Sequence, residues 1–552
     1  MKNIFQRLLI ILVTLLLCNL AASAQIFNWA KSIGGNVTSN GIAVDANGGS
    51  YITGWFLGTA TFGNIQLSTK YNYINFFVAK YDAGGNVLWA KQAQQDTNSY
   101  SVGEGVSVDA NGNTYISGKL LGVVNFGDIK LTATNSLQDI FVAKFDPSGN
   151  CLWAEQAGDS ITSNGITVDA NGNSYVIGNF QKSATFGSFQ LTSGDSGNVF
   201  IAKYDINGNF IWAKKNNGDK HSWAEGFGIS IDANNNIYGS GQFYDNVSFG
   251  NIQLTASGTN SNIFIVKYDV NGNCIWANQS NGSGYYDNAQ VISTDAYGNS
   301  YIAGQFNDTV TLGNSQMISK AHRNAFVAKY DANGNCIWAS QVKSAFSNST
   351  GISLDRKGNS YITGQFGDTA TFGNIQLDAG DSSNFFIAKY DGNGSCLWAK
   401  QSAIIDSNSI AGGLRIASDT NGNSYITGSF TGLLTIGNDI ITGGDFIAKI
   451  SNTVLGITTE KPTIPNYFNI SQNYPNPFNP TTVINYSVPR SNMVTIRVYD
   501  ILGNETATLV NEEKPAGSYS INFNASRLSS GVYFYRMQAG SFVETKKLIL
   551  MK

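Results

Sequence analysis

Apolar and polar residues alternate in short runs along most of the chain. Between residues 351 and 401 the runs are GISLD (351–355), SYITGQF (360–366), FFIAKYD (385–391) and CLWAKQ (396–401). Alternation with period two predicts strands, and the Asn- and Gly-rich segments between them predict hairpin turns. The stretch TATFGNIQL (369–377) predicts a small extended excursion between the second and third strands. This unit is therefore expected to be a four-stranded antiparallel meander.

The same unit recurs along residues 26–451, with spacings of 59 to 64 residues. A tryptophan followed by alanine marks the fourth strand, at Trp29, Trp89, Trp153, Trp212, Trp276, Trp338 and Trp398. An aspartate opens a DANGN-like first turn, at Asp45, Asp109, Asp169, Asp232, Asp295, Asp355 and Asp419. Internal repeats of this length are typical of propellers and solenoids.

The two ends of the repeat region favour a closed ring. The segment IFNWAKS (26–32) is a fourth strand that no other strands precede, and the last repeat stops after its third strand, DFIAKI (445–450). We expect these two segments to pair, because that pairing leaves no open sheet edge between them. The predicted fold is all-β: a seven-bladed β-propeller of four-stranded antiparallel blades, closed by the N-terminal strand and followed by a small immunoglobulin-like β-sandwich.

The repeat VDANGNSY…TGxF…TFGN…FVAKYD…GNxxWA resembles the bacterial seven-bladed propeller repeats called SBBP repeats. The resemblance covers residues 26–451 and implies a propeller domain over residues 25–451. It implies no single activity, because propellers serve as enzymes and as binding modules.

The N-terminal segment has the pattern of an export signal. Lys2 and Arg7 precede an apolar run, Leu8 to Leu17, and Ala22-Ser23-Ala24 is a small-x-small cleavage site. We predict a signal peptide over residues 1–24 and a mature chain that begins at Gln25. Cys18 leaves a lipoprotein as the alternative, although Leu17 is a poor residue before a lipidation site. No later segment is long and apolar enough to predict a transmembrane span.

The last 86 residues, 467–552, are predicted to form a separate domain after a linker at 452–466. Proline becomes frequent in QNYPNPFNPTTVINYSVP (472–489), and the alternating runs that follow predict a small β-sandwich. This tail resembles the type IX secretion (type A) C-terminal sorting domain. The residues that carry the resemblance are Asn473, Tyr474, Pro475, Asn476, Pro477, Phe478, Val498, Tyr499, Asp500, Gly503, Gly531, Val532, Tyr533, Lys546 and Lys547.

The resemblance of the tail implies a location and a partner. The partner is the type IX secretion machinery, and the location is secreted or on the outer-membrane surface of a Gram-negative bacterium, reached through the periplasm. The resemblance also implies that the tail is removed after export. A structural immunoglobulin-like cap fits the strands of the tail but does not explain its NYPNPFNP opening.

The net charge and the positions of the cysteines limit the partners and the chemical roles that the chain can have. The net charge of −3 and the lack of a basic block disfavour a nucleic-acid partner. Cys151, Cys274, Cys336 and Cys396 each lie two residues before a repeated Trp, where other repeats have Val87 or Phe210, so they are interpreted as apolar fillers rather than as disulfides or metal ligands.

Candidate metal and catalytic patterns are weak. His221 and His322 fall in different repeats, which disfavours a zinc site or a Ser-His-Asp triad. Asp109, Asn111 and Asn113 have the spacing of a calcium loop, but no repeat has an acid at position twelve, so a hairpin turn is favoured. Glu104 and Glu225 are expected on connections between blades as surface charges, and Glu155 is outside any repeated position. No metal and no cofactor are predicted.

Variation between repeats is concentrated on one predicted side of the ring. The first and third turns of each repeat are nearly constant, whereas the second connection and the connection to the next repeat vary. By strand parity these two variable connections share one face, which we call the loop face; the opposite side, with the constant turns, is the turn face. Variable loops on a rigid scaffold are common binding sites. The candidate binding residues on the loop face are Tyr71, Tyr73, Lys220, His221, Trp223, Tyr285, Tyr286, His322 and Arg323.

These observations predict a secreted or surface-displayed, non-catalytic protein that binds a polysaccharide or a protein through the loop face. One alternative is a propeller enzyme such as a glycan lyase or hydrolase, with acids on the same face. Another is a purely structural surface component, in which the loop aromatics pack into loop cores.

Overall fold

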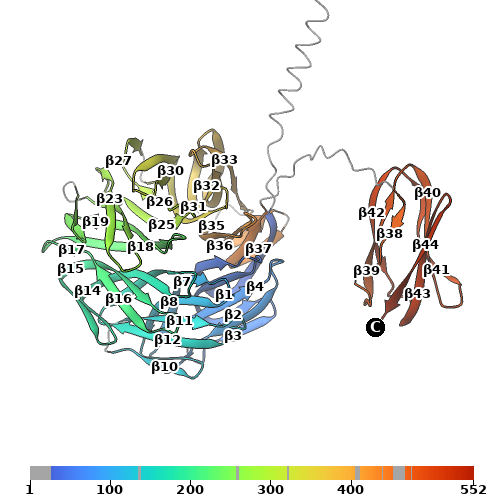
Figure 1. The fold of residues 1–552 in the computed structure, drawn as a ribbon, viewed down its shortest axis with the longest axis horizontal. Helices are drawn as coiled ribbons and strands as arrows, with labels where there is room; N and C mark the ends of the chain where they lie inside the picture. The colour runs from blue at the N-terminus through green and yellow to red at the C-terminus, as the bar shows by residue number, and fades with distance from the viewer. Residues whose placement is uncertain are drawn as a thin grey trace, which may run out of the picture. The chain divides into compact units, whose positions relative to one another are not determined.

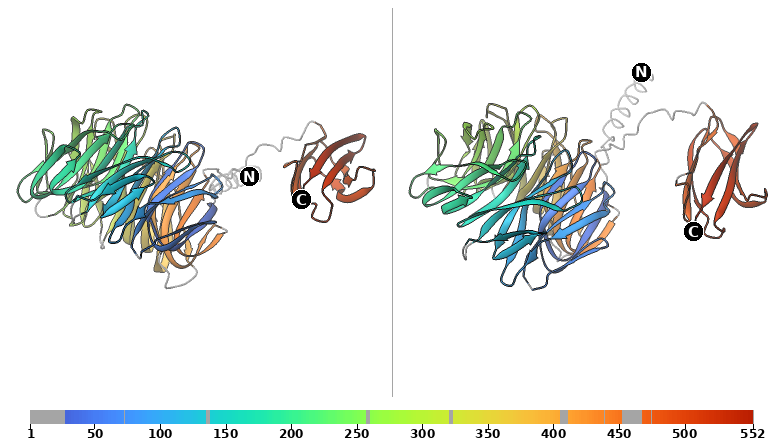
Figure 2. Two further views of the ribbon diagram at one scale, coloured as in Figure 1. Left: turned by 90° about the horizontal axis from the view of Figure 1, so that it is seen from below. Right: turned by 60° about the horizontal axis from the view of Figure 1, so that its bottom comes forward.

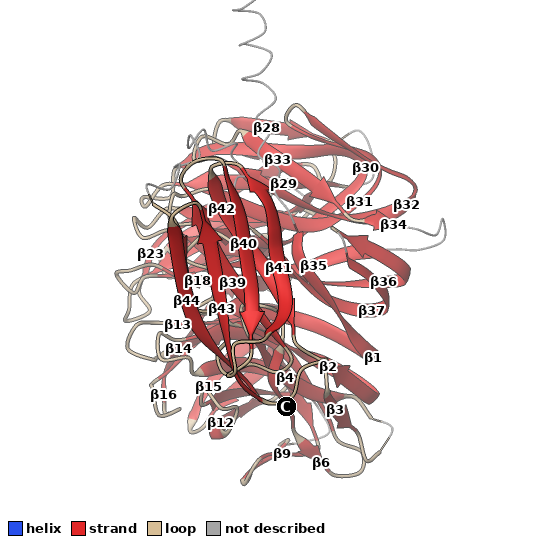
Figure 3. Ribbon diagram, turned by 90° about the vertical axis from the view of Figure 1, so that its right-hand side faces the viewer, coloured by secondary structure: helices blue, strands red, loops and turns tan. Residues whose placement is uncertain are grey.

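The computed structural model describes residues 27–71, 73–134, 138–256, 260–319, 323–404, 411–437, 439–451, 467–473 and 475–551. The chain divides into two compact units, one from Gln25 to Thr453 and one that contains Val454 to Lys552. Within the described residues the structure is all-β, and Figure 3 shows strands and loops without a helix. The predicted signal peptide (1–24) and linker (452–466) lie outside the described residues.

The first unit is a succession of four-stranded antiparallel meanders, as the alternating runs predict. The last strand of one meander leads into the first strand of the next. β1 and β30 are each long enough to be the last strand of one meander and the first strand of the next (Figure 1). The four strands of each meander, in pairing order, are β1 (Phe27–Val44), β2 (Ser50–Phe62), β4 (Asn75–Tyr81) and β5 (Val87–Gln92); β7 (Tyr100–Val108), β8 (Thr114–Leu121), β11 (Asp139–Phe145) and β12 (Cys151–Gly158); β13 (Ile161–Val168), β14 (Ser174–Phe186), β15 (Phe189–Tyr204) and β16 (Phe210–Lys215); β18 (Trp223–Ile231), β19 (Ile237–Tyr244), β22 (Asn262–Tyr268) and β23 (Cys274–Gln279); β25 (Asn288–Thr294), β26 (Ser300–Phe306), β29 (Asn324–Tyr330) and β30 (Cys336–Leu354); β30, β31 (Ser360–Phe372), β32 (Ile375–Tyr390) and β33 (Cys396–Gln401); and β35 (Ala411–Ser418), β36 (Ser424–Ile436), β37 (Asp439–Ile450) and β1.

The predicted excursion after each second strand is a short hairpin. In several repeats it is a separate pair of strands, and a two-residue strand from the connection between meanders pairs with it. These short strands are β3 (Ile65–Ser68), β6 (Gln94–Gln95), β9 (Val123–Phe126), β10 (Ile129–Thr132), β17 (Asn217–Gly218), β20 (Asn246–Phe249), β21 (Ile252–Thr255), β24 (Asn281–Gly282), β27 (Thr309–Leu312), β28 (Ser315–Ile318) and β34 (Ala403–Ile404).

The expected pairing of the N-terminal strand with the last repeat is confirmed. The first half of β1 is antiparallel to β37, with a register that runs from Phe27 opposite Ile450 to Ile33 opposite Asp445. Figures 1 and 2 show this blue strand beside the orange strands β36 and β37. The second half of β1 continues as the first strand of the next meander. One strand therefore joins the two ends of the repeat region.

The apolar cores lie between consecutive meanders rather than within them. One cluster contains Phe76 of β4 together with Phe126 and Phe141 of the following repeat. Another contains Tyr425 and Ile447 of the last meander together with residues of β1, β2 and β4. Each meander is thus buried on both faces by its neighbours, and the last packs against the first.

The constant turns are held by a side-chain network that repeats with the sequence. In the first turn Asp45 Oδ1 accepts the backbone N–H groups of Asn47 at 2.9 Å and Gly49 at 2.8 Å, and Oδ2 accepts the hydroxyl of Tyr51 at 3.1 Å. The Tyr51 ring contacts the ring of Trp89 edge-on. The interpretation of DANGN as a turn in which Asp accepts a backbone N–H is thereby confirmed.

The repeated tryptophans connect each meander to the next one. The indole N–H of Trp29 donates to Ala83 O at 3.2 Å, and that of Trp276 donates to Ala332 O at 3.1 Å. The Trp29 ring lies against Gly85, where an added Cβ would come within 2.7 Å of the indole. Gly85 also has a positive φ of 82°, so both the space and the backbone require glycine at this turn position.

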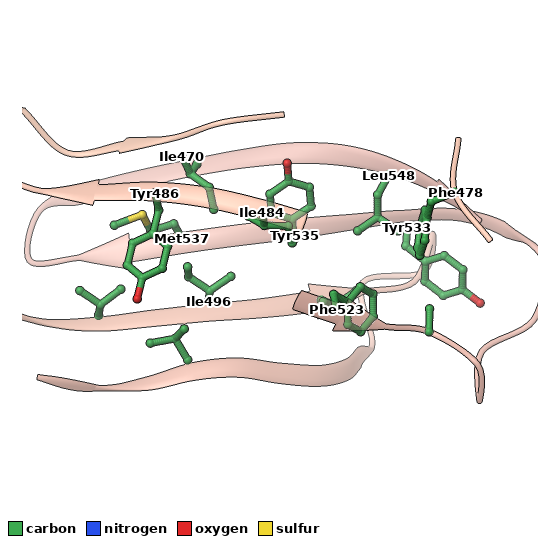
Figure 4. Close-up of a cluster of buried hydrophobic side chains, with 14 of the residues drawn as sticks. Ile470, Phe478, Ile484, Tyr486, Ile496, Phe523, Tyr533, Tyr535, Met537 and Leu548 are labelled. Carbon is green, nitrogen blue, oxygen red and sulfur yellow. The ribbon is translucent and has the colours of Figure 1, made fainter. Parts of the chain in front are cut away.

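The second unit consists of two sheets around one apolar core. Ile484, Ile496, Phe523, Tyr535 and Leu548 from both sheets belong to a single buried cluster (Figure 4). The three-stranded sheet contains β38 (Asn469–Ile470), β39 (Thr481–Val488) and β42 (Gly517–Asn524), and the four-stranded sheet contains β41 (Glu505–Lys514), β40 (Asn492–Tyr499), β43 (Gly531–Ala539) and β44 (Phe542–Leu550).

Candidate functional site

The variable connections of neighbouring meanders contact one another, as strand parity requires. The hydroxyl of Tyr73, in a second connection, donates to Asn98 Oδ1 at 2.8 Å, and Asn98 belongs to the connection that leads to the next meander. Arg323, in another second connection, forms a bridge with Phe346 and places its guanidinium 5.7 Å from the centre of that ring. These contacts define the loop face in the described residues.

The predicted binding residues lie on different connections rather than in one constellation. The carbonyl of Tyr71 accepts the backbone N–H of Tyr73 at 2.7 Å. Lys220 and His221 are exposed in the turn that precedes β18, and Tyr285 and Tyr286 are 57% and 61% exposed before β25. Among the described residues no side-chain hydrogen bond or ring contact joins one of these groups to another. His322 lies outside the described residues.

A groove of about 390 Å³ surrounds Trp223 on the loop face. We call it the Trp223 groove; its lining residues come from three consecutive meanders and are Gln138, Ser160, Ile161, Thr162, Asn179, Phe180, Gln181, Gly197, Trp223 and Glu225. Trp223 begins β18 and pairs with Tyr244. Its ring lies against Gly197, where a Cβ would come within 2.8 Å of the indole. The absence of a side chain at Gly197 therefore lets the indole lie against the backbone of the preceding meander.

Hydrogen bonds fix several of the polar groups of the groove. Glu225 Oε2 accepts the amide of Gln242 at 2.6 Å, and Asn179 Oδ1 accepts the backbone N–H of Gly226 at 2.7 Å. Gln138 Oε1 accepts the hydroxyl of Tyr100 at 2.8 Å, which leaves its amide nitrogen as a donor. The groove thus combines one indole with oriented amide and carboxylate groups.

Most of these groove residues were not predicted from the sequence, and the prediction for two glutamates was wrong. Glu104 and Glu225 do not lie on connections between blades, since they lie inside the first strands β7 and β18. Glu104 forms an ion pair of 2.7 Å with Lys119 on the neighbouring strand. Gln138 precedes β11 and Asn179 lies within β14, so only the pairing register shows that they come together on the loop face.

A buried acid lies beneath the exposed tyrosines of one loop. Asp287 follows Tyr286 and is fully buried, and its Oδ1 accepts the backbone N–H of Asn307 at 3.1 Å. Burial raises the pKa of the Asp287 carboxyl to about 7. The amide oxygen of Asn307 accepts the backbone N–H of Tyr286, so this acid is part of the loop's internal packing.

The four thiols of the repeats lie outside the Trp223 groove. Cys151, Cys274, Cys336 and Cys396 are free and half-buried. Burial raises the pKa of the Cys151 thiol to about 12, which keeps it protonated. In the described part of the chain no group of three or more His, Cys, Asp or Glu residues is arranged to hold a metal ion. Among the described residues, no helix has the length and hydropathy needed to cross a membrane.

Residues of the predicted sorting motif form hydrogen bonds that join the first segment of the tail to its last strand. Asn473 is buried, and its amide donates to Pro475 O at 3.0 Å and to Thr482 Oγ1 at 2.9 Å. Asn476 Oδ1 accepts the backbone N–H of Ile549 at 2.9 Å. Phe478 is 3% exposed and donates its backbone N–H to Ile549 O at 3.0 Å. The sequence NPF is therefore paired with the end of the chain.

The remaining motif residues form turns and strands of the same unit. Gly503 has a φ of 85° in the turn that Asp500 opens. Gly531 starts β43, Tyr533 donates its hydroxyl to Ser529 O at 2.9 Å, and Lys546 forms an ion pair of 2.7 Å with Glu544. Pro475 and Pro477 flank Asn476, and Tyr474 lies outside the described residues.

Family models match one segment in each of the two units. Residues 472–551 match the family described as "Secretion system C-terminal sorting domain", and residues 153–179 match the "Beta-propeller repeat" family, SBBP. An uncharacterized WD repeat-containing protein, L264, of Acanthamoeba polyphaga mimivirus is 26% identical over 436 residues. That alignment covers 64% of this chain and 31% of the viral protein, so the chain spans about a third of that relative's length.

Similar solved structures include PorZ, an essential bacterial surface component of the type IX secretion system of Porphyromonas gingivalis. It is 9% identical, with 95% of this chain and 100% of PorZ covered and a TM-score of 0.18. A Bacteroides thetaiotaomicron protein of unknown function is 11% identical, with coverages of 77% and 98% and a TM-score of 0.27. Both TM-scores are below 0.5.

The two matched segments contain the motifs DANGN of the repeat and NYPNPFNP of the tail. A sorting domain of this kind implies an interaction with the secretion machinery. The chain therefore contains a β-propeller repeat of the SBBP family and carries a type IX secretion sorting domain at its C-terminus, as expected of a secreted or cell-surface protein.

Proposed function

We propose that this protein is a non-catalytic, seven-bladed β-propeller that type IX secretion exports and that binds a polysaccharide through the Trp223 groove. In this proposal residues 1–24 are the signal peptide, residues 25–451 are the propeller, 452–466 the linker, and residues 467–552 form an immunoglobulin-like sorting domain. The tail engages the secretion machinery and is removed after export, so the propeller is the part that acts outside the cell.

Three observations support a closed seven-bladed ring. Each meander has the same four strands and the same turn network, and the apolar clusters lie between consecutive meanders. The pairing of β1 with β37 brings the last meander onto the first. A small cavity is lined by β1, β7, β13, β18, β25, β30 and β35, which are the first strands of all these meanders. A ring with these strands innermost accounts for all three observations.

The observation that carries the binding proposal is the composition of the Trp223 groove. Sugar rings present apolar C–H faces that pack on aromatic rings, and their hydroxyls pair with amide and carboxylate groups. The groove supplies the Trp223 indole and the side chains of Gln138, Asn179, Gln181 and Glu225. Its volume of about 390 Å³ is within the range of ligand sites. Lys220 and His221 are exposed and precede Trp223 in the sequence, and their side chains can donate hydrogen bonds to a hydroxylated or acidic glycan.

Glycan hydrolysis is the second candidate function, and the composition of the groove disfavours it. Glycosidases use two carboxyl groups that flank the scissile bond. Among the described residues that line the Trp223 groove, Glu225 is the single carboxylate, and the amide of Gln242 already occupies one of its oxygens. A binding role needs no second acid, and this supports the non-catalytic proposal.

The proposal is tested by binding of the purified chain, without its signal peptide, to an array of bacterial surface polysaccharides. The comparison variants are Trp223→Ala and Tyr297→Ala. Tyr297 is an 83% exposed aromatic residue in a constant turn, so it is a matched aromatic control on the turn face. We expect Trp223→Ala to weaken the strongest polysaccharide contact by about 1–3 kcal/mol, which is roughly 5- to 150-fold in Kd. Tyr297→Ala is expected to leave that affinity unchanged.

The possible outcomes separate the alternatives. A melting temperature of Trp223→Ala close to that of the wild type, combined with weaker binding, supports the groove as the site. A large loss of stability without a specific loss of binding means that the Trp223 ring is loop core, and the structural alternative is then favoured. Product release from any bound glycan overturns the non-catalytic assignment. Binding to surface proteins but to no polysaccharide overturns the ligand class.

A further inference from the structure

A second site on this molecule lies along the innermost strands, apart from the loop face. The cavity lined by the seven first strands has a volume of about 170 Å³, and we call it the channel. Each of these strands has a register shift at the same point of the repeat. Such shifts mark β-bulges, which bend the strand and redirect a side chain, and they are frequent next to functional sites. The channel is therefore lined by residues in a shared, irregular backbone conformation.

One residue of the channel departs from the repeat. The position that follows the bulge is glycine in five of the seven strands and Val291 in β25, but it is Arg415 in β35. Close packing of neighbouring first strands explains the glycines, because a Cβ on Gly228 would come within 2.9 Å of the backbone nitrogen of Ile292 on β25. The repeat does not explain an arginine at this point, where the long cationic side chain lines the channel.

The guanidinium of Arg415 is anchored on one side and has donors left over. Nη1 donates to Thr350 O at 3.1 Å on the neighbouring first strand and to Leu414 O at 2.9 Å. A guanidinium has five N–H groups, so the three on Nε and Nη2 have no hydrogen-bond partner among the described residues. Arg415 is partly buried, and burial lowers the pKa of its guanidinium, so an acceptor beside it stabilises the charged form. This argues for an acceptor within the channel.

The charges around the channel leave that acceptor to a ligand. Among the described residues that line it, Glu104 is the only carboxylate, and it already pairs with Lys119 at 2.7 Å. No described carboxylate forms an ion pair with Arg415. Glu104 also interacts electrostatically with the Arg415 guanidinium, and together with Lys119 these three groups carry one net positive charge. Gln290 lines the same channel, and its amide makes no hydrogen bond to the described residues.

We propose that the channel binds a small carboxylate anion on the free Nε and Nη2 donors of Arg415. A planar carboxylate matches the two parallel N–H groups of a guanidinium and forms paired, charge-assisted hydrogen bonds with them. The amide of Gln290 provides a further donor in the same cavity. The volume of about 170 Å³ suits an organic acid of a few carbon atoms and is much smaller than the Trp223 groove. This site is independent of the polysaccharide proposal.

Calorimetric titration of the chain without its signal peptide tests this site, with acetate and inorganic phosphate as separate probes in chloride buffer. The variants are Arg415→Gly, which restores the residue found in most repeats, and Arg415→Gln, which retains side-chain bulk without the charge. We expect saturable acetate binding to the wild type and at least about a 10-fold weaker Kd in both variants, because the paired charge-assisted bonds are lost. Tyr297→Ala is the control and is expected to bind acetate normally, because Tyr297 is exposed in a constant turn.

Several results would overturn the proposal. If the wild type shows no saturable binding of acetate, or if Arg415→Gly or Arg415→Gln binds it as the wild type does, the channel is not a carboxylate site. Tighter binding of phosphate than of acetate would overturn the carboxylate assignment. If Arg415→Gly does not fold, Arg415→Gln decides the question. A loss of stability in Arg415→Gln without acetate binding by the wild type would make Arg415 a purely structural link between β30 and β35.

Discussion

Truncation of Trp29 to alanine is expected to weaken the junction between the first and last meanders. Trp29 lies on the half of β1 that pairs with β37, and its side chain is 8% exposed. Its ring contacts Tyr425 of the last meander edge-on, with the ring centres 6.1 Å apart. Its indole N–H donates to Ala83 O of the first meander at 3.2 Å. One side chain therefore contacts both sides of the junction.

The magnitude follows from these contacts. Replacement of a buried tryptophan by alanine costs roughly 3–5 kcal/mol, which includes the lost transfer free energy and the cavity that remains. Part of this cost, about 1 kcal/mol, is the lost hydrogen bond to Ala83 O. The loss is comparable with a large part of the stability of an ordinary domain. The N-terminal half of β1 is an edge strand that pairs mainly with β37. It is therefore expected to detach before the rest of the unit unfolds.

Urea unfolding and limited proteolysis together measure this effect. Trp276→Ala is the matched control, because Trp276 is 9% exposed, donates to Ala332 O at 3.1 Å and contacts Tyr238 edge-on. Both variants are expected to lose similar free energy of unfolding. Only Trp29→Ala is expected to release an N-terminal peptide from within β1 under native conditions, since Trp276 lies on a strand that is internal to the chain.

The reasoning is refuted by either of two results. One is a Trp29→Ala protein whose free energy of unfolding is within about 1 kcal/mol of the wild type, which is a typical effect of a surface substitution. The other is release of the same peptide at the same rate from both variants, because the detachment would then not depend on the junction.

Three further predictions concern single residues. Asp445 is buried, burial raises its pKa to about 7, and its Oδ1 has no partner among the described residues, whereas five other repeats have asparagine at this position. A folded-state pKa above the unfolded value of about 3.9 means that stability is lost as the pH rises from about 4 to 7. Asp445→Asn should therefore stabilise the protein by at most about 4 kcal/mol at pH 8 and remove this pH dependence. Urea unfolding at about pH 4 and at about pH 8 measures both effects. Cys396→Val should change the free energy of unfolding by less than about 1 kcal/mol, because the side chain acts as a small apolar filler; a larger loss would show that its Sγ contact with Trp398 O matters. Asn473→Ala should destabilise the tail by about 1–3 kcal/mol, because a buried amide that donates to Pro475 O and Thr482 Oγ1 is lost, and should lower the amount of exported protein in a cell fractionation assay; normal export would contradict this.

The sequence was sufficient to predict the strand pattern and the pairing of the two ends. Alternation, the DANGN turns and the repeated tryptophans are local signals, and each repeat shows them independently. The pairing of the Trp29 strand with the last repeat was predictable from the strand count. The segment around Trp29 is a fourth strand without the other three strands of its repeat, and the repeat that ends in DFIAKI lacks its fourth strand. The contacts of NPF with the end of the chain were not predictable, because they join residues about 70 positions apart.

The channel and the groove depend on register and could not be read from the sequence. The bulge of β7 lies within the Gly-rich, poorly alternating segment VGEGVS, so this first strand was predicted too short and Glu104 was assigned to a connection. The groove contains Gln138, Asn179 and Glu225, which come from three consecutive meanders and are 41 and 46 residues apart in the sequence. Only the packing of neighbouring meanders brings these side chains together.

Fractionation of cells that produce the full-length chain or a chain without residues 467–552 tests the central claim, that the tail exports a complete propeller. The apolar clusters of the described residues in 27–451 do not include residues of the tail, so the truncated chain is expected to fold and to accumulate in the periplasm as a protease-resistant protein. The full-length chain is expected in the medium or on the cell surface. A truncated chain that reaches the medium or the surface in normal amounts would contradict the account.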